Sequence, residues 1–314
     1  MLTHSHIDPY PSRSDENEGV PSGGNNVKLV ATRDDPCRNI LLLGGMKMKG
    51  TFKKNRKVLF PIIIVLVGLL GIAVPSHAIT NGQPDGYRHP FVGAANNGQV
   101  FCSGVAISPK IFVTAAHCFR YSGERVSVTF DPEPFADPDK TVYYTGTWYP
   151  HPGFCNDCGP GVPQFDTNDV AVVVLDKNVK LDYYAELPTE GLVDTLAMGT
   201  EVTIVGYGAQ FYNTGGGPRQ PVYLLTRYFA PSLLIASEDI LSDEYIKLTE
   251  NPAQGKGGVC FGDSGGPDLL GDTRIILAIN SFGTNYNCTG VGYSNRIDTE
   301  SILNFIGQYL YKRR

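Results

Sequence analysis

The chain has 314 residues, 42% of them hydrophobic and 18% charged, which is the composition of a folded globular protein and excludes a largely disordered one. The formal net charge is −5, and the residues after Ala78 contain 16 Lys and Arg against 25 Asp and Glu. This acidic balance argues against nucleic acid as a partner, because phosphates are bound by basic surfaces.

The N-terminal quarter has the order of segments that is typical of a secretory signal peptide. Six Lys and Arg residues between positions 47 and 57 precede an apolar run over 58–74, and the sequence Pro-Ser-His-Ala follows it. We predict a signal peptide over 46–78 with cleavage after Ala78, although a run of 17 apolar residues also fits a short membrane anchor. Residues 1–45 are polar and unpatterned, and we interpret them as a disordered extension or an artefact of the start site.

Cysteine usage also indicates export. Six of the seven cysteines follow Ala78, and an even number suits disulfide bonds in an oxidising compartment. The seventh, Cys37, lies within residues 1–45.

From Ile79 onward, short apolar or alternating runs are separated by turn residues, a pattern that predicts an all-β fold of sandwich or barrel type. Near the C-terminus the apolar residues follow helical spacing from Ile302 to Leu310, behind Asp298 or Thr299 as the N-cap. Examples of the expected strands are 105–107, 111–114, 125–130, 142–149, 170–175, 201–207, 222–228, 275–279 and 291–297.

The run from Gly257 to Pro267 places one serine, Ser264, among glycines and directly after an acid. Such a run suits neither a core nor a regular element, so we interpret it as a loop that exposes the hydroxyl. It also fits the Gly-x-Ser-x-Gly elbow of α/β-hydrolases, in which the histidine follows the serine. All six histidines precede Ser264, which excludes that order and leaves one in which the base comes first.

Two earlier motifs supply partners for this serine. His117 lies among small residues directly after a predicted strand, whereas His89 and His151 precede prolines in turns and are interpreted as structural. Asp169 opens the apolar run 170–175; it could simply cap that strand, but a carboxylate at a buried strand needs a partner. Together with His117 and Ser264 it completes a Ser-His-Asp set.

The motifs at 114–118, 168–171, 262–267 and 281–283, in this order and at this spacing, resemble those of the trypsin/chymotrypsin family of serine endopeptidases. The resemblance extends from Ile79 to the C-terminal helix. It implies an all-β fold of two antiparallel β-barrels of the chymotrypsin type with a C-terminal α-helix. The first barrel is expected over 79–190, with His117 and Asp169, and the second over 191–314, with Ser264.

The resemblance also implies the chemistry. Ser264 attacks the peptide carbonyl, His117 takes its proton and later protonates the leaving amine, and Asp169 orients the imidazole. Ser281 is expected to donate a hydrogen bond to Asp169. No cofactor is required for this reaction.

Two further groups of residues follow from the same resemblance. The backbone N–H groups of Gly262 and Ser264 are expected to form the oxyanion hole. Ser281, Phe282 and Gly283 are expected to bind the substrate backbone as an added strand.

The resemblance gives the signal cleavage a second consequence. In relatives of this kind, a new N-terminal Ile or Val amine pairs with the acid before the serine, which is Asp263 in this chain. Cleavage after Ala78 would expose Ile79, so we expect signal peptidase itself to generate the active form, without a separate propeptide. The residues after Ile79, Thr-Asn, depart from the small residues usual in the family.

The primary pocket holds the substrate residue called P1, whose carbonyl is attacked. By alignment its base is Gly258, and the lack of a carboxylate there argues against a preference for Lys or Arg. No histidine follows His151 to select Glu. The far wall of the pocket lies near Val291. If the Val291 side chain points into the pocket, small apolar P1 residues fit; if a neighbouring glycine does, larger ones fit. We expect an uncharged apolar P1 residue.

Three disulfides are expected. The resemblance implies Cys102–Cys118 and Cys260–Cys288. A local loop disulfide, Cys155–Cys158, is favoured over a zinc site with His151 because no fourth ligand is evident.

An acidic loop falls where relatives hold calcium. It fits a calcium ion, although a solvated acidic turn is the simpler interpretation. Its acids are Asp131, Glu133, Asp137 and Asp139.

The sequence thus predicts a secreted, monomeric serine endopeptidase that acts on proteins or peptides and has no stable membrane association after signal cleavage. One alternative is an inactive relative that serves as a secreted binding module, although all three triad residues are present. Another is a membrane-anchored protease that stays latent because Ile79 is never released.

Overall fold

The computed structural model describes Ile79 and residues 82–159, 165–209, 211–212, 221–236, 243–284 and 288–311. The predicted extension and signal peptide, residues 1–45 and 46–78, lie outside the described residues, as do Thr80 and Asn81. No helix within the described ranges has the length and apolar character that crossing a membrane requires.

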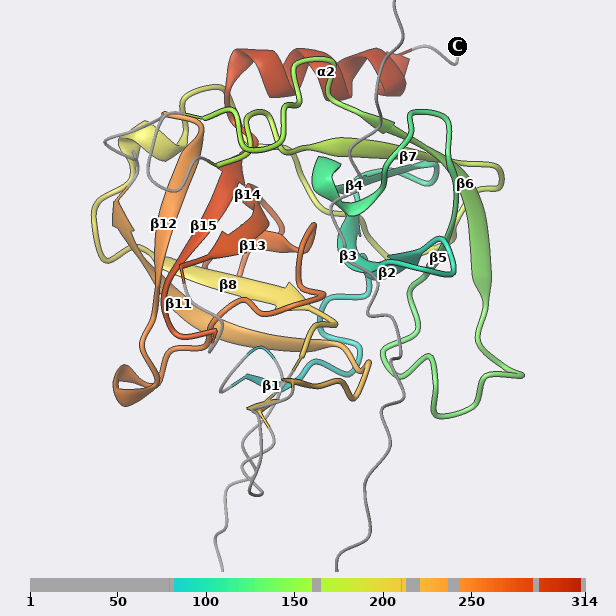
Figure 1. The fold of residues 1–314 in the computed structure, drawn as a ribbon, viewed down its shortest axis with the longest axis horizontal. Helices are drawn as coiled ribbons and strands as arrows, with labels where there is room; N and C mark the ends of the chain where they lie inside the picture. The colour runs from blue at the N-terminus through green and yellow to red at the C-terminus, as the bar shows by residue number, and fades with distance from the viewer. Residues whose placement is uncertain are drawn as a thin grey trace, which may run out of the picture. The chain divides into compact units, whose positions relative to one another are not determined.

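Six antiparallel strands close the first barrel in the order β2-β3-β4-β7-β6-β5 (Figure 1). Its interior is filled by side chains such as Phe112, Trp148 and Val172, each at most 1% exposed, and burying one such side chain contributes about 1.5–3 kcal/mol. The strands are β2 (Val92–Asn96), β3 (Phe101–Ala106), β4 (Ile111–Thr114), β5 (Arg125–Thr129), β6 (Tyr143–Pro150) and β7 (Ala171–Leu175).

The second barrel also has six antiparallel strands, and it closes because β11 pairs with both β12 and β8. Its core includes Ile204, Ile246 and Leu277. The strands are β8 (Glu201–Gly206), β11 (Tyr228–Ala236), β12 (Tyr245–Glu250), β13 (Pro267–Leu270), β14 (Ile276–Gly283) and β15 (Gly290–Arg296). The prediction of two antiparallel barrels is therefore confirmed.

Three short strands lie outside the two barrel circuits. The first, β1 (Gln83–Pro84), pairs with β11 of the second barrel although it precedes the first barrel in the chain. The other two, β9 (Phe211–Tyr212) and β10 (Pro221–Val222), pair with each other.

The C-terminal helix α2 (Glu300–Tyr311) follows the second barrel in the chain but packs against the first. Its buried residues Ile302, Phe305 and Ile306 belong to the first barrel's core cluster, and the helix contacts β7. The hydroxyl of Thr299 accepts the Ile302 N–H at 3.5 Å, so Thr299 serves as the N-cap.

One expected strand, at 222–228, is wrong. Val222 ends β10, Tyr228 begins β11, and the residues between them are in no strand. Around Arg227 the backbone bonds to loops rather than to a neighbouring strand: its N–H donates to Pro132 O at 2.7 Å, and its carbonyl accepts from Asp85 N at 2.9 Å. The buried Arg227 side chain also binds Asp85, which explains why this segment leaves the sheet.

Candidate active site

His117 and Asp169 are held together by two hydrogen bonds. His117 lies in the short 3₁₀ helix η1 (Ala116–Cys118), directly after β4, and its backbone N–H donates to Asp169 Oδ1 at 2.9 Å. The ring Nδ1 lies 2.7 Å from Asp169 Oδ2. These bonds orient both backbone and ring, and they leave Nε2 as the ring nitrogen available to another group.

The carboxylate of Asp169 is completely buried, yet it is well supplied with donors. It accepts from the His117 backbone, the His117 ring and the Ser281 hydroxyl. The preceding residue, Asn168, adopts a left-handed conformation with φ +50°, which turns the chain just before β7.

Ser281 reaches Asp169 from the second barrel. It lies on β14, where the register with β15 shifts between Asn280 and Phe282, so Ser281 is the extra residue of a bulge. Bulges redirect side chains out of the regular alternation. The structure thus brings His117, Asp169 and Ser281 together across the two barrels.

The surroundings of His117 raise its pKa above the ordinary value. Burial lowers this pKa, but the charge of Asp169 and its hydrogen bond raise it, and the charge of Asp166 raises it further. The side chain still keeps 28% of its surface exposed. The imidazole is therefore accessible and a stronger base than free histidine, as a general base requires.

The glycine-rich loop carries Ser264 against the first barrel. The Ser264 carbonyl accepts the Ser103 N–H of β3 at 2.8 Å. Gly265, with φ +84°, packs so closely that a Cβ there would collide with Thr114 Oγ1. The loop therefore lies against the end of β4, three residues before His117.

The Ser264 side chain is half-buried, and within the described ranges it makes no hydrogen bond, including to His117. Catalytic hydrogen bonds are often open before substrate binds. In the same part of the chain, neither the N–H of Gly262 nor that of Ser264 is bonded to a carbonyl, which leaves both donors for another acceptor.

Asp263 turns away from the serine into the second barrel. It is completely buried, and it accepts from Gly208 N at 2.7 Å and from Cys260 N at 2.9 Å. Burial raises its pKa to about 7, although these two N–H groups oppose the rise. No cationic group among the described residues pairs with this carboxyl.

Ile79 is also buried, in the second barrel's core with Val193, Ile204 and Val259. No hydrogen bond or ion pair joins Ile79 and Asp263 among the described residues. In the full chain Ile79 is bonded to Ala78 and has no free amine, so the expected activation pair is not formed here.

The expected base of the primary pocket, Gly258, faces a residue that the sequence argument overlooked. A Cβ built on Gly258 would lie 2.8 Å from the Cβ of Glu250, the last residue of β12. On β15, Val291 lies opposite Thr249, and neighbouring strand residues point to opposite faces. Gly292 faces Glu250, so a glycine rather than Val291 lines this side of the pocket.

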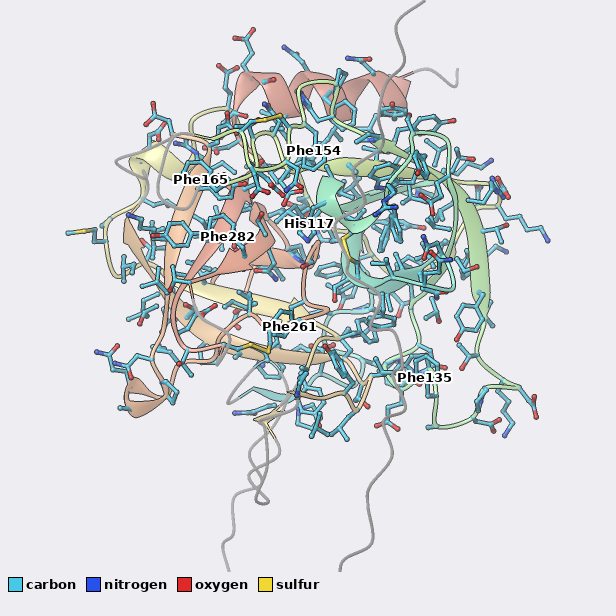
Figure 2. The ribbon with its side chains drawn as sticks, in the orientation of Figure 1. His117, Phe135, Phe154, Phe165, Phe261 and Phe282 are labelled. Carbon is cyan, nitrogen blue, oxygen red and sulfur yellow. A yellow bond between two sulfur atoms is a disulfide. The ribbon has the colours of Figure 1, made fainter. Side chains whose placement is uncertain are left out.

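Aromatic side chains lie beside the site. Phe282 stacks on Tyr293 at a ring separation of 4.9 Å. It also stacks on Phe165 at 6.2 Å, and Figure 2 labels both of these phenylalanines. Tyr245 packs edge-on against Phe165 and donates to Asp166 O at 2.7 Å. Phe282 therefore belongs to an apolar surface on the second-barrel side of His117.

The three expected disulfides are present: Cys102–Cys118, Cys155–Cys158 and Cys260–Cys288. The disulfide at Cys155–Cys158 takes up both thiols of the alternative zinc site. His151 is occupied as well, since its Nε2 lies 3.2 Å from Ser301 Oγ and its Nδ1 accepts from Gly153 N at 3.0 Å.

The acidic loop at 131–139 makes local contacts. Asp131 accepts the Glu133 N–H at 2.9 Å, and Asp137 lies 2.5 Å from Lys140 Nζ. Within the part of the chain that the structure describes, these acids form no group of three within reach of one ion. Calcium binding here remains a prediction.

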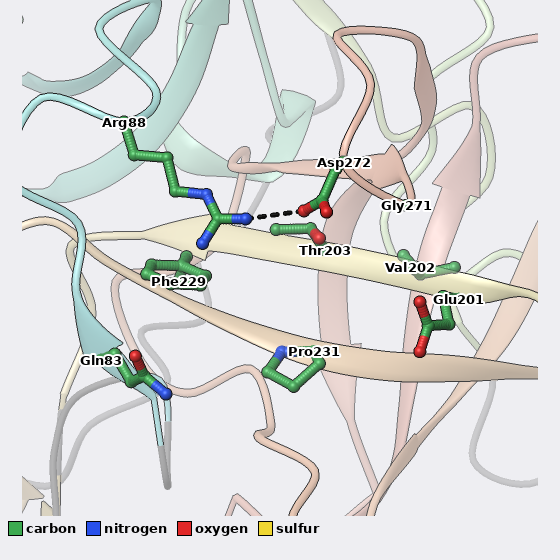
Figure 3. Close-up of a pocket in the computed structure, with 9 residues that line it drawn as sticks. All are labelled: Gln83, Arg88, Glu201, Val202, Thr203, Phe229, Pro231, Gly271 and Asp272. Carbon is green, nitrogen blue, oxygen red and sulfur yellow. Dashed lines mark hydrogen bonds and ion pairs between the residues drawn. The ribbon is translucent and has the colours of Figure 1, made fainter.

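A separate hollow lies on the second barrel, away from the triad residues. It is bordered by the ion pair of Arg88 and Asp272, at 2.6 Å, and by Phe229 (Figure 3). Its lining includes neither His117 nor Ser264, so it is not the site described above.

Two closed six-stranded barrels with a terminal helix define the chymotrypsin-like class of serine proteases. Residues 79–306 match the family model described as Trypsin, so the chain belongs to the trypsin family and is a serine endopeptidase. It is 24% identical to human granzyme M over 240 residues, which cover 73% of this chain and 88% of the relative.

Solved structures show the same fold. One is neuropsin, a serine protease expressed in the limbic system of mouse brain, with a TM-score of 0.58, 19% identity, and coverage of 73% of this chain and 98% of that one. Another is human heparin binding protein, with a TM-score of 0.53, 18% identity, and coverage of 74% and 97%.

Proposed function

We propose that this chain is a secreted endopeptidase that cleaves proteins or peptides through an acyl-enzyme formed on Ser264. The observation that carries the proposal is the hydrogen-bonded set of Ser281, Asp169 and His117, next to a loop that presents one unbonded serine hydroxyl.

In the first step His117 Nε2 takes the proton of Ser264 Oγ as this oxygen attacks the peptide carbonyl. The tetrahedral intermediate expels the amine, which receives that proton from His117, and an ester on Ser264 remains. Water, activated by the same imidazole, hydrolyses this ester and regenerates the serine. The buried charge of Asp169 stabilises the imidazolium in both steps.

The oxyanion of each intermediate would be bound by the N–H groups of Gly262 and Ser264. Their lack of carbonyl partners within the described ranges supports this role. A donor of this kind contributes about 3–4 kcal/mol to transition-state binding in comparable sites.

Activation would follow from release of Ile79. Asp263 is a buried carboxyl without a cationic partner among the described residues, and a new α-amine would supply the missing charge. The three disulfides support export to an oxidising compartment, where a monomeric enzyme without a required cofactor would act.

The uncharged apolar P1 preference expected from Gly258 stays a prediction of the sequence. Gly292 rather than Val291 lies on the pocket side, and the carboxyl of Glu250 fills the space beside it.

The test starts from protein purified from the medium of cells that express the full chain. N-terminal sequencing should find Ile79 first, a fluorophosphonate should label Ser264, and the Ser264→Ala variant should neither be labelled nor cleave peptides. A secreted form that begins at Ile79 and binds no fluorophosphonate would support the binding module instead. A protein that stays in the membrane with its N-terminal segment uncut would support the latent anchored form.

A further inference from the structure

Glu250 is an acid buried beneath the primary pocket. Its exposed fraction is 1%, and its Oε1 accepts the Val259 N–H at 2.8 Å. Its Oε2 has no hydrogen-bond partner among the described residues. Buried carboxyl oxygens are nearly always paired, so this oxygen is open to a partner from outside the chain.

Three glycines surround this carboxyl. A Cβ on Gly258 would lie 3.0 Å from Glu250 Cδ, one on Gly292 would collide with Oε1, and one on Gly283 would lie 3.8 Å from Oε2. Glycine at 258 and 292 leaves the space that the glutamate side chain occupies, whereas a Cβ at 283 would only touch it.

These glycines come from three segments of the binding site. Gly258 lies on the loop that leads to Ser264, Gly292 lies on β15, and Gly283 ends β14, directly after Phe282. Gly283 is exposed, whereas Gly258 and Gly292 are buried. The unpaired Oε2 therefore lies just beneath the surface at Gly283, where a P1 side chain would enter.

The charges around Glu250 are negative. Burial raises the pKa of Glu250 to about 8, the Val259 N–H opposes this, and the nearby Asp268 and Asp263 raise it further. Asp268 is itself completely buried on β13. A cation that entered this space would favour the ionised carboxylate and would pair with it.

We propose that Glu250 supplies, from β12, the carboxylate that Gly258 lacks, and that it selects substrates with Lys or Arg at P1. This inference rests on the proposed endopeptidase function and replaces the apolar preference expected from Gly258 alone. An apolar P1 side chain would leave Oε2 unpaired, whereas an ammonium or guanidinium group would satisfy it.

The test uses mature enzyme and peptides that differ only at P1, with Lys, Arg, Gln or Leu at that position. Active molecules are counted by fluorophosphonate labelling of Ser264. We expect the highest kcat/KM for Lys or Arg, and Glu250→Gln should lower the Lys-to-Leu ratio of kcat/KM at least about 30-fold. The control is Asp272→Asn, which removes the same charge from an exposed residue and should change the ratio less than about fivefold.

Two measurements on the unmodified enzyme cover the case in which Glu250→Gln does not fold. Between pH 6 and 9 the Lys-to-Leu ratio should rise as Glu250 ionises, because titration of His117 affects both substrates equally and cancels. Benzamidine, a cation, should inhibit more strongly than the neutral benzamide.

The outcomes separate the two proposals. A labelled enzyme that prefers Leu or Gln, or a Lys-to-Leu ratio that does not depend on pH or on Glu250, would overturn the role of Glu250 and leave the endopeptidase intact. Failure to label Ser264 together with no cleavage of any peptide would overturn the proposed function itself.

Discussion

Asp169 determines the properties of His117. Its carboxylate is fully buried, holds both the backbone and the ring of His117, and is itself held by Ser281. The resulting rise in the pKa of His117 has a direct consequence for activity. Protonated His117 cannot act as a base, so kcat/KM should fall as the pH drops through this raised pKa.

The pH dependence provides a prediction at the scale of one residue. The acid limb of kcat/KM should lie above pH 6.5, the ordinary pKa of histidine, and Asp169→Asn should lower kcat about 10⁴-fold. Asp166→Asn is the control: it removes a more distant charge, and should shift the acid limb downward with little loss of kcat. A stopped-flow or steady-state pH profile of each variant measures both quantities, and an unchanged profile in both variants would contradict the assignment.

At the scale of one element, the loop from Cys260 to Gly266 depends on its fit against the first barrel. Gly265 has φ +84°, and a side chain there would collide with Thr114 Oγ1 and Ser103 O. The loop can therefore present Ser264 only if position 265 carries no Cβ.

We predict that Gly265→Ala lowers the free energy of unfolding through two effects: the strain of alanine in a left-handed backbone, and a further loss of about 1–3 kcal/mol from the collision of its Cβ with the first barrel. The same substitution should abolish fluorophosphonate labelling of Ser264. Gly271→Ala is a matched control, because Gly271 also has positive φ, +51°, but a Cβ there would meet nothing within 4 Å. Gly271→Ala should lower the free energy of unfolding only by the strain of a left-handed alanine, about 1–2 kcal/mol. Equal urea-unfolding midpoints for the two variants would show that the packing of this loop does not matter.

At the scale of the whole molecule, Arg227 joins the two barrels. Its guanidinium is completely buried and pairs with Asp85 at 2.7 Å. It also donates to two carbonyls of the first barrel, Val92 O at 2.8 Å and Phe130 O at 3.1 Å, although Arg227 itself precedes β11 of the second. The relative position of the barrels, and with it the alignment of Ser281 with Asp169, depends in part on this contact.

Replacing Arg227 by Met should cost about 3–5 kcal/mol of unfolding free energy, because the buried carboxylate of Asp85 would keep only His89 as a partner. Arg274→Met is the control: Arg274 pairs with Glu186 at the surface, where such pairs contribute at most about 1 kcal/mol. Urea unfolding followed by tryptophan fluorescence measures both. A loss below 1 kcal/mol for Arg227→Met would show that this contact does not hold the barrels together.

Local patterns predicted much of the fold and the triad. The apolar runs 111–114 and 170–175 form β4 and β7, within a residue of the expected ends. The prediction succeeds there because the residues that favour a strand are also the ones buried in the barrel. The strands β2, β12 and β13 have no counterpart among the expected runs: β2 is made of small residues, the alternation in β12 is interrupted by Lys247, and β13 begins at Pro267. The segment 222–228 looked like a strand, but its backbone bonds to loops of distant sequence.

The sequence by itself predicted the roles of Ser264, His117 and Asp169, because the motifs that contain them resemble those of one protease family in order and spacing. Only the tertiary structure decided what faces the pocket. Glu250 meets Gly258, Gly283 and Gly292 because β12, β14, β15 and the loop before Ser264 converge in space. The spacing of residues along the chain does not show this convergence, because it depends on strand register and on the absence of side chains at Gly258 and Gly292.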